Sequence, residues 1–282
     1  MPANVGEMFY TGTTPWHGEG IRLAEPATLE EALKVRGLNW EVGKVDLLTA
    51  DEPPSPVTRR RAIVRLDRPA GHPKRVLGVA HLGFKPLQNR DGGLLFDAIF
   101  GGGRHVYHTG GYLGSGEVVW LLAKVDHPRE IAPGDTVEPY ALFTNSHDGS
   151  VAIHIRLTTV RVVCQNTLSM ALSERTLRPQ FRRVHQGSFR DHANAAQGFF
   201  AEALAELDRT TISFVGLTKK QCTKEQFNSL IERLLPLPMK PRRTESNPRT
   251  LNAYERKRLD VEATRQAIAE LRNRGCRSCR RG

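Results

Sequence analysis

The clearest alternation of hydrophobic and polar positions in the chain lies between residues 151 and 158. Valine, isoleucine and leucine occupy the odd positions, whereas alanine, histidine, Arg156 and threonine occupy the even positions. A period of two residues is typical of a strand, because successive side chains of a strand point to opposite faces. The pattern therefore predicts a strand with one apolar face and one polar, basic face.

The alternation changes phase after Thr158, because the next two valines occupy even positions. A slip of one residue sends side chains to the opposite face unless a bulge or bend absorbs it. A bulge would keep Arg161 on the same face as Arg156. Beyond residue 164 the apolar spacing becomes helical, and Asn166 or Thr167 can accept the hydrogen bond of an N-cap. We expect a short helix to start there.

The rest of the chain divides into a strand-rich part followed by a helical part. Alternating apolar positions predict strands at 61–66, 76–81 and 137–144, and a glycine-turned hairpin over 109–126. Helices are predicted at 28–37, 89–100, 191–207, 223–235 and 250–273. Two of them begin with a capping box, Thr28-x-x-Glu31 and Thr223-x-x-Gln226.

This order of elements predicts an α+β fold, because alternating strands and helices would be needed for a parallel α/β sheet. We expect an antiparallel sheet with hairpins in the N-terminal two thirds, packed by helices, and a helical C-terminal part. Prolines at 236, 238 and 241 indicate a linker. They divide the chain into a core domain, residues 1–235, which would carry a nucleic-acid-binding face, and a basic helical tail with its linker, residues 236–282.

Composition sets the class of protein. The chain has 282 residues, and 39% hydrophobic residues are enough for a buried core. No apolar run approaches the roughly 20 residues that span a bilayer, and the N-terminus lacks the pattern of a secretory signal. Four cysteines at uneven spacing do not make a disulfide scaffold, which is typical of a reducing compartment. We therefore expect a cytoplasmic protein without a membrane partner.

The net charge of +11 is concentrated in two segments. Residues 155–190 contain seven Lys and Arg against one acidic residue, and residues 240–282 contain thirteen against five. A local excess of positive charge favours a polyanion as partner. We expect that contact on the structured segment 155–190, whereas the tail is equally typical of a solvated surface.

Most motifs with possible chemistry have a plainer interpretation. His147 and Asp148 are adjacent, as metal ligands of phosphohydrolases can be, but their surroundings also have the composition of a polar hairpin turn, which is favoured. Cys276 and Cys279 have the spacing of half a zinc site, with no second ligand pair after them. Cys164 follows a strand pattern, where a buried thiol is the usual outcome. The sequence therefore assigns no catalytic residue, no metal ligand and no cofactor.

One group of residues has the composition of a nucleic-acid surface. Arginine and lysine supply phosphate contacts, and amide side chains bond the backbone or base edges without strict sequence choice. The candidates lie around a loop that enters a helix and around the strand at 151–158; they are Lys85, Gln88, Asn89, Arg156, Arg161 and Asn166. The alternative is a polar sheet face that helices or solvent cover.

Five segments resemble the phage- and plasmid-related family catalogued as a domain of unknown function. They are PWHGEG at 15–20, LEEALKVRGLNWEV at 29–42, LGVAHLGFKPLQNRDGGLLFD at 77–97, GGYLGSGEVVWLLAKV at 110–125 and TNSHDGSVAIHIRLTTVRVVCQNTLSMAL at 144–172. That domain is similar to single-strand annealing recombinases of the Redβ, RecT and Erf kind. The resemblance implies a protein that holds single-stranded DNA along a basic groove, within homo-oligomeric rings or filaments and without a nucleotide cofactor. It gives most weight to Arg156 and Arg161.

The leading hypothesis is a non-enzymatic protein that binds single-stranded DNA and anneals strands in a phage or plasmid recombination system. Arg156 and Arg161 would neutralise phosphates with help from Lys85, while the three amide side chains would position the strand. A second hypothesis is a metal-dependent nuclease or phosphohydrolase centred on His147 and Asp148. A third is a structural or anti-restriction interaction protein whose basic tail contacts nucleic acid incidentally.

Overall fold

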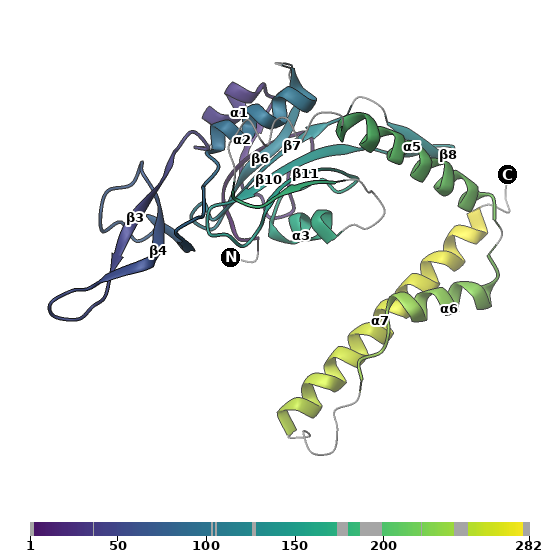
Figure 1. The fold of residues 1–282 in the computed structure, drawn as a ribbon. Helices are drawn as coiled ribbons and strands as arrows, with labels where there is room; N and C mark the ends of the chain where they lie inside the picture. Colours follow the sequence, from purple (N-terminus) through teal and green to yellow (C-terminus); the bar gives the residue numbers. More distant parts are fainter. Residues whose placement is uncertain are drawn as a thin grey trace. The chain divides into compact units, whose positions relative to one another are not determined.

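The computed structural model describes residues 3–35, 37–102, 104, 106–125, 128–173, 180–186, 199–220, 222–239 and 248–278. The chain forms two compact units, Met1–Thr218 and Lys219–Gly282 (Figure 1). The first unit combines sheets and helices, and the second is helical. The predicted α+β class is therefore confirmed. Within the described residues, no helix is both long and apolar enough to cross a membrane.

A seven-stranded sheet forms the centre of the first unit, with the strand order β12-β11-β10-β7-β6-β1-β2. Neighbouring strands are antiparallel, except for the parallel pair β1 and β2. The strands are β1 (Val5–Thr11), β2 (Ile21–Leu23), β6 (Tyr107–Leu113), β7 (Val118–Lys124), β10 (Tyr140–Ser146), β11 (Ile153–Thr158) and β12 (Gln180–Arg183). The hairpin predicted over 109–126 is the pair β6 and β7.

Two smaller sheets accompany the large one. The three-stranded sheet has the order β3-β4-β5, with β3 at Val42–Leu48, β4 at Pro56–Arg65 and β5 at Val76–His81. In Figure 1 the strands β3 and β4 project from the rest of the first unit as an arm. A two-stranded ribbon pairs β8 (Arg129–Ala132) with β9 (Asp135–Val137).

Helices cover both faces of the large sheet (Figure 1). On one face lie α1 (Leu29–Val35) and α2 (Asn89–Phe96), which continues into the π-helical turn η1 (Asp97–Gly101). On the other face lies α3 (Gln165–Ser173). The helix α5 (Phe199–Thr218) contacts β8 through an ion pair between Arg129 and Asp208 at 2.6 Å.

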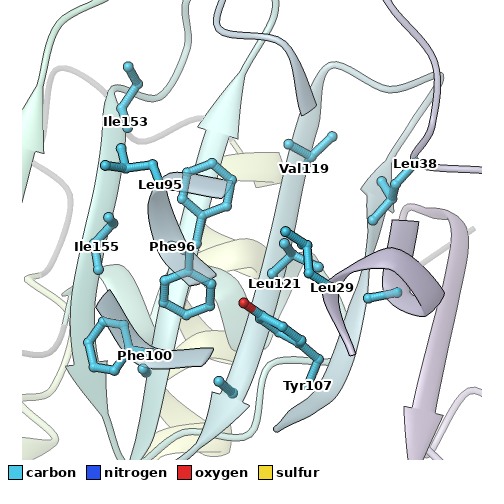
Figure 2. Close-up of a cluster of buried hydrophobic side chains, with 14 of the residues drawn as sticks. Leu29, Leu38, Leu95, Phe96, Phe100, Tyr107, Val119, Leu121, Ile153 and Ile155 are labelled. Carbon is cyan, nitrogen blue, oxygen red and sulfur yellow. The ribbon is translucent and has the colours of Figure 1, made fainter. Parts of the chain in front are cut away.

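The core under α1 and α2 is rich in aromatic rings (Figure 2). Phe96 packs with its ring centroid 5.1 Å from that of Phe100 and 5.9 Å from that of Phe143 in β10. Gly92 allows this close approach of helix and sheet, because a Cβ atom there would lie 2.4 Å from Cζ of Phe143. From β11, Ile153 and Ile155 also point into this cluster.

A second hydrophobic cluster fills the opposite face of the sheet. It contains Trp120 and Leu142 from the sheet, covered by Val162, Leu168 and other residues of the segment that follows β11. Burial on both faces means that the polar, basic face predicted for β11 is covered, which is the alternative that the sequence left open. The cover is the chain's own next segment, which folds back over the strand.

The phase slip after Thr158 marks the end of β11, and a bend follows it instead of a bulge. The helix α3 then begins at Gln165, where Thr167 Oγ1 accepts hydrogen bonds from the backbone amides of Val163 and Cys164 at 2.9 and 3.0 Å. A helix therefore starts close to the expected place, but neither Asn166 nor Thr167 is its N-cap, because both lie within the first turn.

Both predicted capping boxes are present. The Thr28 amide donates to a carboxylate oxygen of Glu31 at 2.8 Å, and the Glu31 amide donates to Thr28 Oγ1 at 3.3 Å. Thr223 and Gln226 make the same reciprocal pair at the start of α6. Reciprocal bonds of this kind satisfy amides that the first helical turn otherwise leaves without partners. The first part of the helix predicted over 191–207 lies outside the described residues.

The second unit consists of α6 (Lys224–Leu234) and α7 (Pro248–Ser278). Arg265 of α7 donates to the carbonyl oxygen of Leu235 from Nε at 2.9 Å and from Nη2 at 2.6 Å. These bonds cap the C-terminal end of α6 with a positive charge, which is favourable at that end of a helix. The residues 240–247 between the helices and Cys279 lie outside the described residues, so the cysteine pair predicted as half a zinc site is not described.

Candidate nucleic-acid interface

Two of the six predicted contact residues hold the helix α2 against its neighbours. The Gln88 side chain makes two hydrogen bonds to the backbone of Val42 in β3. Its Nε2 donates to the Val42 carbonyl oxygen at 3.0 Å, and its Oε1 accepts from the Val42 amide at 2.9 Å. Asn89 is 4% exposed, and Nδ2 donates to the carbonyl oxygen of Leu38 at 3.0 Å. Its Oδ1 lies 2.8 Å from Nε2 of His147. We therefore reassign both amides from nucleic-acid contact to the packing of the fold.

Arg156 is also reassigned, because only 2% of the residue is exposed. Its Nη1 donates to the carbonyl oxygen of Leu172 at 2.9 Å. The guanidinium thus connects β11 to the end of α3 inside the second cluster. A phosphate could not reach it without displacing the helix.

The other three predicted residues are more accessible but lie in separate places. Arg161 is half-buried and donates from Nη2 to the Thr11 carbonyl oxygen at 2.7 Å. Asn166 is exposed in the first turn of α3. Lys85 is exposed, and its backbone amide donates to the His185 carbonyl oxygen at 2.9 Å. Of these three, Lys85 adjoins a groove between the small sheet and the edge of the large one, through its bond to His185.

The pair His147 and Asp148 does not form a shared site. His147 is fully buried beside Trp40, at a ring separation of 5.2 Å, and burial lowers its pKa to about 3. Asp148 lies in the turn between β10 and β11, where Oδ1 accepts from the amide and the hydroxyl of Ser150 at 2.9 and 2.6 Å. Gly149 completes the turn at a φ of +81°. Among the described residues, no group of three or more His, Cys, Asp and Glu side chains could hold a metal ion.

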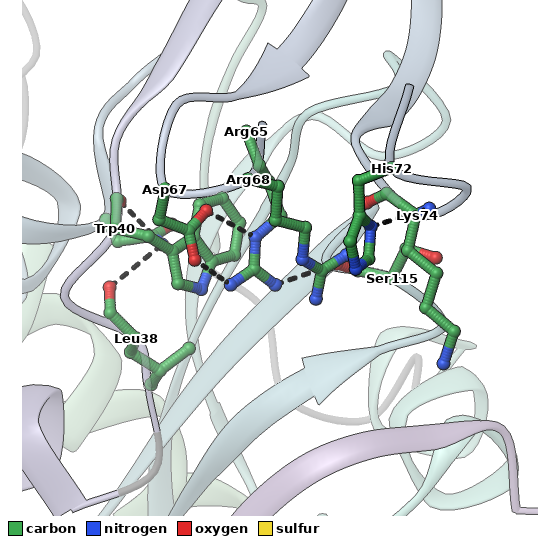
Figure 3. Close-up of polar contacts among 9 residues, drawn as sticks. Leu38, Trp40, Arg65, Asp67, Arg68, His72, Lys74 and Ser115 are labelled. Atoms are coloured by element: carbon green, nitrogen blue, oxygen red, sulfur yellow. Dashed lines mark hydrogen bonds and ion pairs between the residues drawn. The ribbon is translucent and has the colours of Figure 1, made fainter. Parts of the chain in front are cut away.

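A buried arginine locks the small sheet onto the large one (Figure 3). The Arg65 guanidinium lies 4.2 Å from the Trp40 ring and 5.2 Å from the Tyr112 ring. It donates twice to Asp67, at 3.0 and 2.7 Å, and once to the Ser115 carbonyl oxygen at 2.9 Å. The hydrogen bonds from Arg65 lower the pKa of Asp67 below its usual value. Because Ser115 lies in the turn between β6 and β7, these bonds fix the position of β4, and of β5 beside it.

The groove lies between the small sheet and the edge of the large one, and it encloses about 430 Å³. One wall carries Arg60 of β4 and His81 of β5, which are directly opposite each other in the sheet register. The other wall carries Arg182 of β12 and His185 just after it. The turn at 148–150 also lines the groove.

The walls are held in place by specific contacts. The Phe84 ring packs on the His185 ring at 4.6 Å, and His185 Nε2 lies 3.1 Å from the Val151 carbonyl oxygen. Gly78 of β5 touches the backbone of the 148–150 turn, because a Cβ atom there would lie 2.8 Å from Cα of Asp148. The width of the groove on this side is therefore fixed by two backbones in contact.

Positive charge dominates the groove. Arg60 and Arg182 are exposed, and within the described part of the chain neither forms an ion pair. Among the described residues that line the groove, two arginines stand against one carboxylate, Asp148, which accepts hydrogen bonds from Ser150. The groove is thus suited to a phosphate or another anion.

Sequence reasoning missed most of this groove. Arg182 belongs to the basic segment 155–190, so the segment was identified but the residue was not. Arg60 belongs to a run of three arginines, residues 59–61, which was the available signal. Phe84 had no distinguishing pattern.

Comparison with known proteins gives a family but no relative with a described activity. No curated protein and no solved structure matches the chain significantly. A family match extends over residues 76–272, which include β5, the 148–150 turn and β12 of the groove, whereas Arg60 precedes it. The chain belongs to the family described as Domain of unknown function (DUF932).

Proposed function

We propose that the protein binds single-stranded DNA in the cationic groove and promotes strand annealing in a phage or plasmid recombination system. The observation that carries this proposal is the pair of exposed arginines, Arg60 and Arg182, on facing walls of one groove. Lys85 is exposed and its backbone amide donates to His185 of the groove, so we expect its side chain to add positive charge nearby. The resemblance to single-strand annealing recombinases supplies the second part of the proposal.

Annealing requires that two phosphate backbones approach each other, and neutralised phosphates repel each other less. Arg60 and Arg182 would neutralise the phosphates of the bound strand. One groove spans only a short piece of strand, whereas known single-strand binding folds cover about 4–16 nucleotides. We therefore propose a homo-oligomer, ring or filament, in which grooves of several copies act on one strand.

The alternative functions differ in their support. A metal-dependent nuclease centred on His147 and Asp148 is not favoured, because the histidine is buried and bonded to Asn89 while the aspartate is bonded to Ser150. A structural or anti-restriction protein, whose basic tail contacts nucleic acid incidentally, needs no groove. Deletion of residues 240–282 separates that alternative from ours, because groove binding would survive the deletion.

The test is the affinity of the full chain for a labelled single-stranded oligonucleotide, measured by fluorescence anisotropy at several salt concentrations with and without EDTA. Each phosphate contact contributes about 0.7 to the slope of log K against log salt for single strands, so the double variant Arg60→Gln, Arg182→Gln should lose about 1.4 of that slope. Arg90→Gln is the matched control, because Arg90 is an exposed arginine of the same unit that pairs with Glu30.

Three results would overturn the proposal. The absence of single-strand binding at low salt would remove its basis. An unchanged slope in the double variant would exclude this groove. Degradation of the oligonucleotide in divalent metal, abolished by EDTA, would support the nuclease. Mixing complementary labelled strands with the wild-type protein then tests annealing directly, and pairing that resists EDTA and weakens with salt is the expected result.

A further inference from the structure

The groove has an apolar surface as well as a cationic one, and contact with phosphates alone would require only the cationic surface. Besides its arginines, it exposes two large apolar side chains, Val79 at 50% and Val184 at 55%. Val79 lies on the same face of the small sheet as Arg60, because Arg60 pairs with His81 two positions further along β5. Val184 lies two positions after Arg182 on the opposite wall. Each wall therefore presents a cation and a valine.

An aromatic ring lies beside these residues. Phe84 is half-buried, and the part that lines the groove is held by the His185 ring and by the nearby turn, since a Cβ atom at Gly149 would lie 3.9 Å from Phe84 Cε2. The lining is thus cationic in one part and apolar and aromatic in another. A nucleotide has the same division, into an anionic phosphate and a base with an apolar face.

The size of the groove limits how much of a strand it can hold. Sites for small molecules enclose about 300–1,000 Å³, and the volume of about 430 Å³ lies near the lower end of that range. Gly78 and the Asp148 backbone are in contact beside the groove, and the turn that carries Asp148 lines it. The carboxylate of Asp148 on that side would repel a phosphate, which leaves the arginines as its place.

We infer that the groove holds one nucleotide unit, with its phosphate between Arg60 and Arg182 and its base against Phe84, Val79 and Val184. This inference rests on the proposed function, and it names the part of the strand that the site selects. The groove then requires an unpaired base, because a base within a duplex is stacked and cannot enter.

The experiment is competition against the labelled oligonucleotide by three probes: deoxycytidine 5′-monophosphate, deoxyribose 5-phosphate and inorganic phosphate. The nucleotide should compete at least about 5-fold better than the sugar phosphate, since stacking of one base on an aromatic side chain contributes a factor of this size or more. Equal competition by the nucleotide and the sugar phosphate would overturn the inference.

Variants assign the two halves of the site. Phe84→Leu should weaken nucleotide binding by about 5-fold or more and leave phosphate binding unchanged, while Arg182→Gln should weaken both. Because Phe84 also packs against the core, Val184→Ser provides a second test at an exposed position where folding is not at risk. Nucleotide affinity that none of these changes affects would refute the site.

The outcomes separate this inference from the proposed function. The arginine variants could lose strand binding while the mononucleotide fails to compete in the wild-type protein. This result would overturn the one-nucleotide site but not the proposal that the groove binds single-stranded DNA. Direct binding of the mononucleotide, measured by isothermal titration calorimetry, to a protein that does not bind the labelled oligonucleotide would support the site and overturn the annealing function. Binding of neither probe would overturn both.

Discussion

Replacement of Asn89 by alanine tests whether this side chain serves the fold or a nucleic-acid surface. The residue is 4% exposed, and its amide joins three segments: Nδ2 donates to the carbonyl oxygen of Leu38 at 3.0 Å and of Trp40 at 3.4 Å, and Oδ1 lies 2.8 Å from His147 Nε2. Alanine would leave the Leu38 oxygen and the His147 nitrogen buried without partners. Each such group costs about 1–3 kcal/mol, so the free energy of unfolding should fall by roughly 2–6 kcal/mol.

The assay is urea unfolding followed by tryptophan fluorescence. All three tryptophans, at positions 16, 40 and 120, lie in the first unit, so the signal reports on the unit that contains Asn89. Since whole domains are stable by about 5–15 kcal/mol, the expected loss is large and the midpoint should move clearly. The variant protein that remains folded should bind single-stranded DNA with unchanged affinity.

The neighbouring residue provides the control. Arg90→Ala removes a side chain that is 55% exposed and should change the free energy of unfolding by less than about 0.5 kcal/mol. The reasoning is refuted if Asn89→Ala unfolds like the wild type and loses DNA affinity, because the amide would then act on the surface, as the sequence alone had suggested.

Three further predictions concern the same unit. Gly78→Ala should destabilise it by about 1–3 kcal/mol, because the new Cβ would lie 2.8 Å from Cα of Asp148; an unchanged Tm would contradict this. The neutral imidazole of His147 has a pKa lowered to about 3 from 6.5, so below pH 6.5 the unfolded state takes up a proton that the folded state refuses. Unfolding free energies should therefore fall by up to about 1.4 kcal/mol per pH unit as the pH drops from 6.5 towards 4.5, and His147→Gln, measured in parallel, should lack this component. Thr28→Ala should cost about 1 kcal/mol in urea unfolding by breaking the capping box with Glu31, whereas Thr28→Ser should retain most of that stability, and equal values for both variants would count against it.

Elements with local signals could be predicted from the sequence. The hairpin of β6 and β7 has its apolar alternation and its glycine turn within one short stretch. The capping boxes at Thr28 and Thr223 place both partners three residues apart, so no tertiary contact is needed to recognise them. The turn at His147 and Asp148 was recognised for the same reason.

The roles of Arg156, Gln88 and Asn89 could not be predicted, because their partners are set by tertiary packing. An alternating sequence predicts a polar face on a strand but does not show whether water or a helix covers that face. The polar face of β11 is covered by the helix α3. Gln88 bonds to Val42, which is 46 residues away in the chain. Polar side chains that bond distant backbone groups have the same composition as those that bind a ligand.

The location of the groove shows why charge summed along the chain identifies a segment better than a site. Arg60 lies within residues 1–154, where acidic residues outnumber basic ones by 18 to 16, so no window of that length would single it out. Strand pairing places it opposite His81, and the Arg65 contacts hold this sheet beside the edge strand that carries Arg182. Two arginines from segments of opposite net charge thus face one groove. Strand register and the packing of the two sheets therefore determine which charged side chains share a site. A search of related sequences for this groove should compare residues at the same register positions as Arg60 and Arg182.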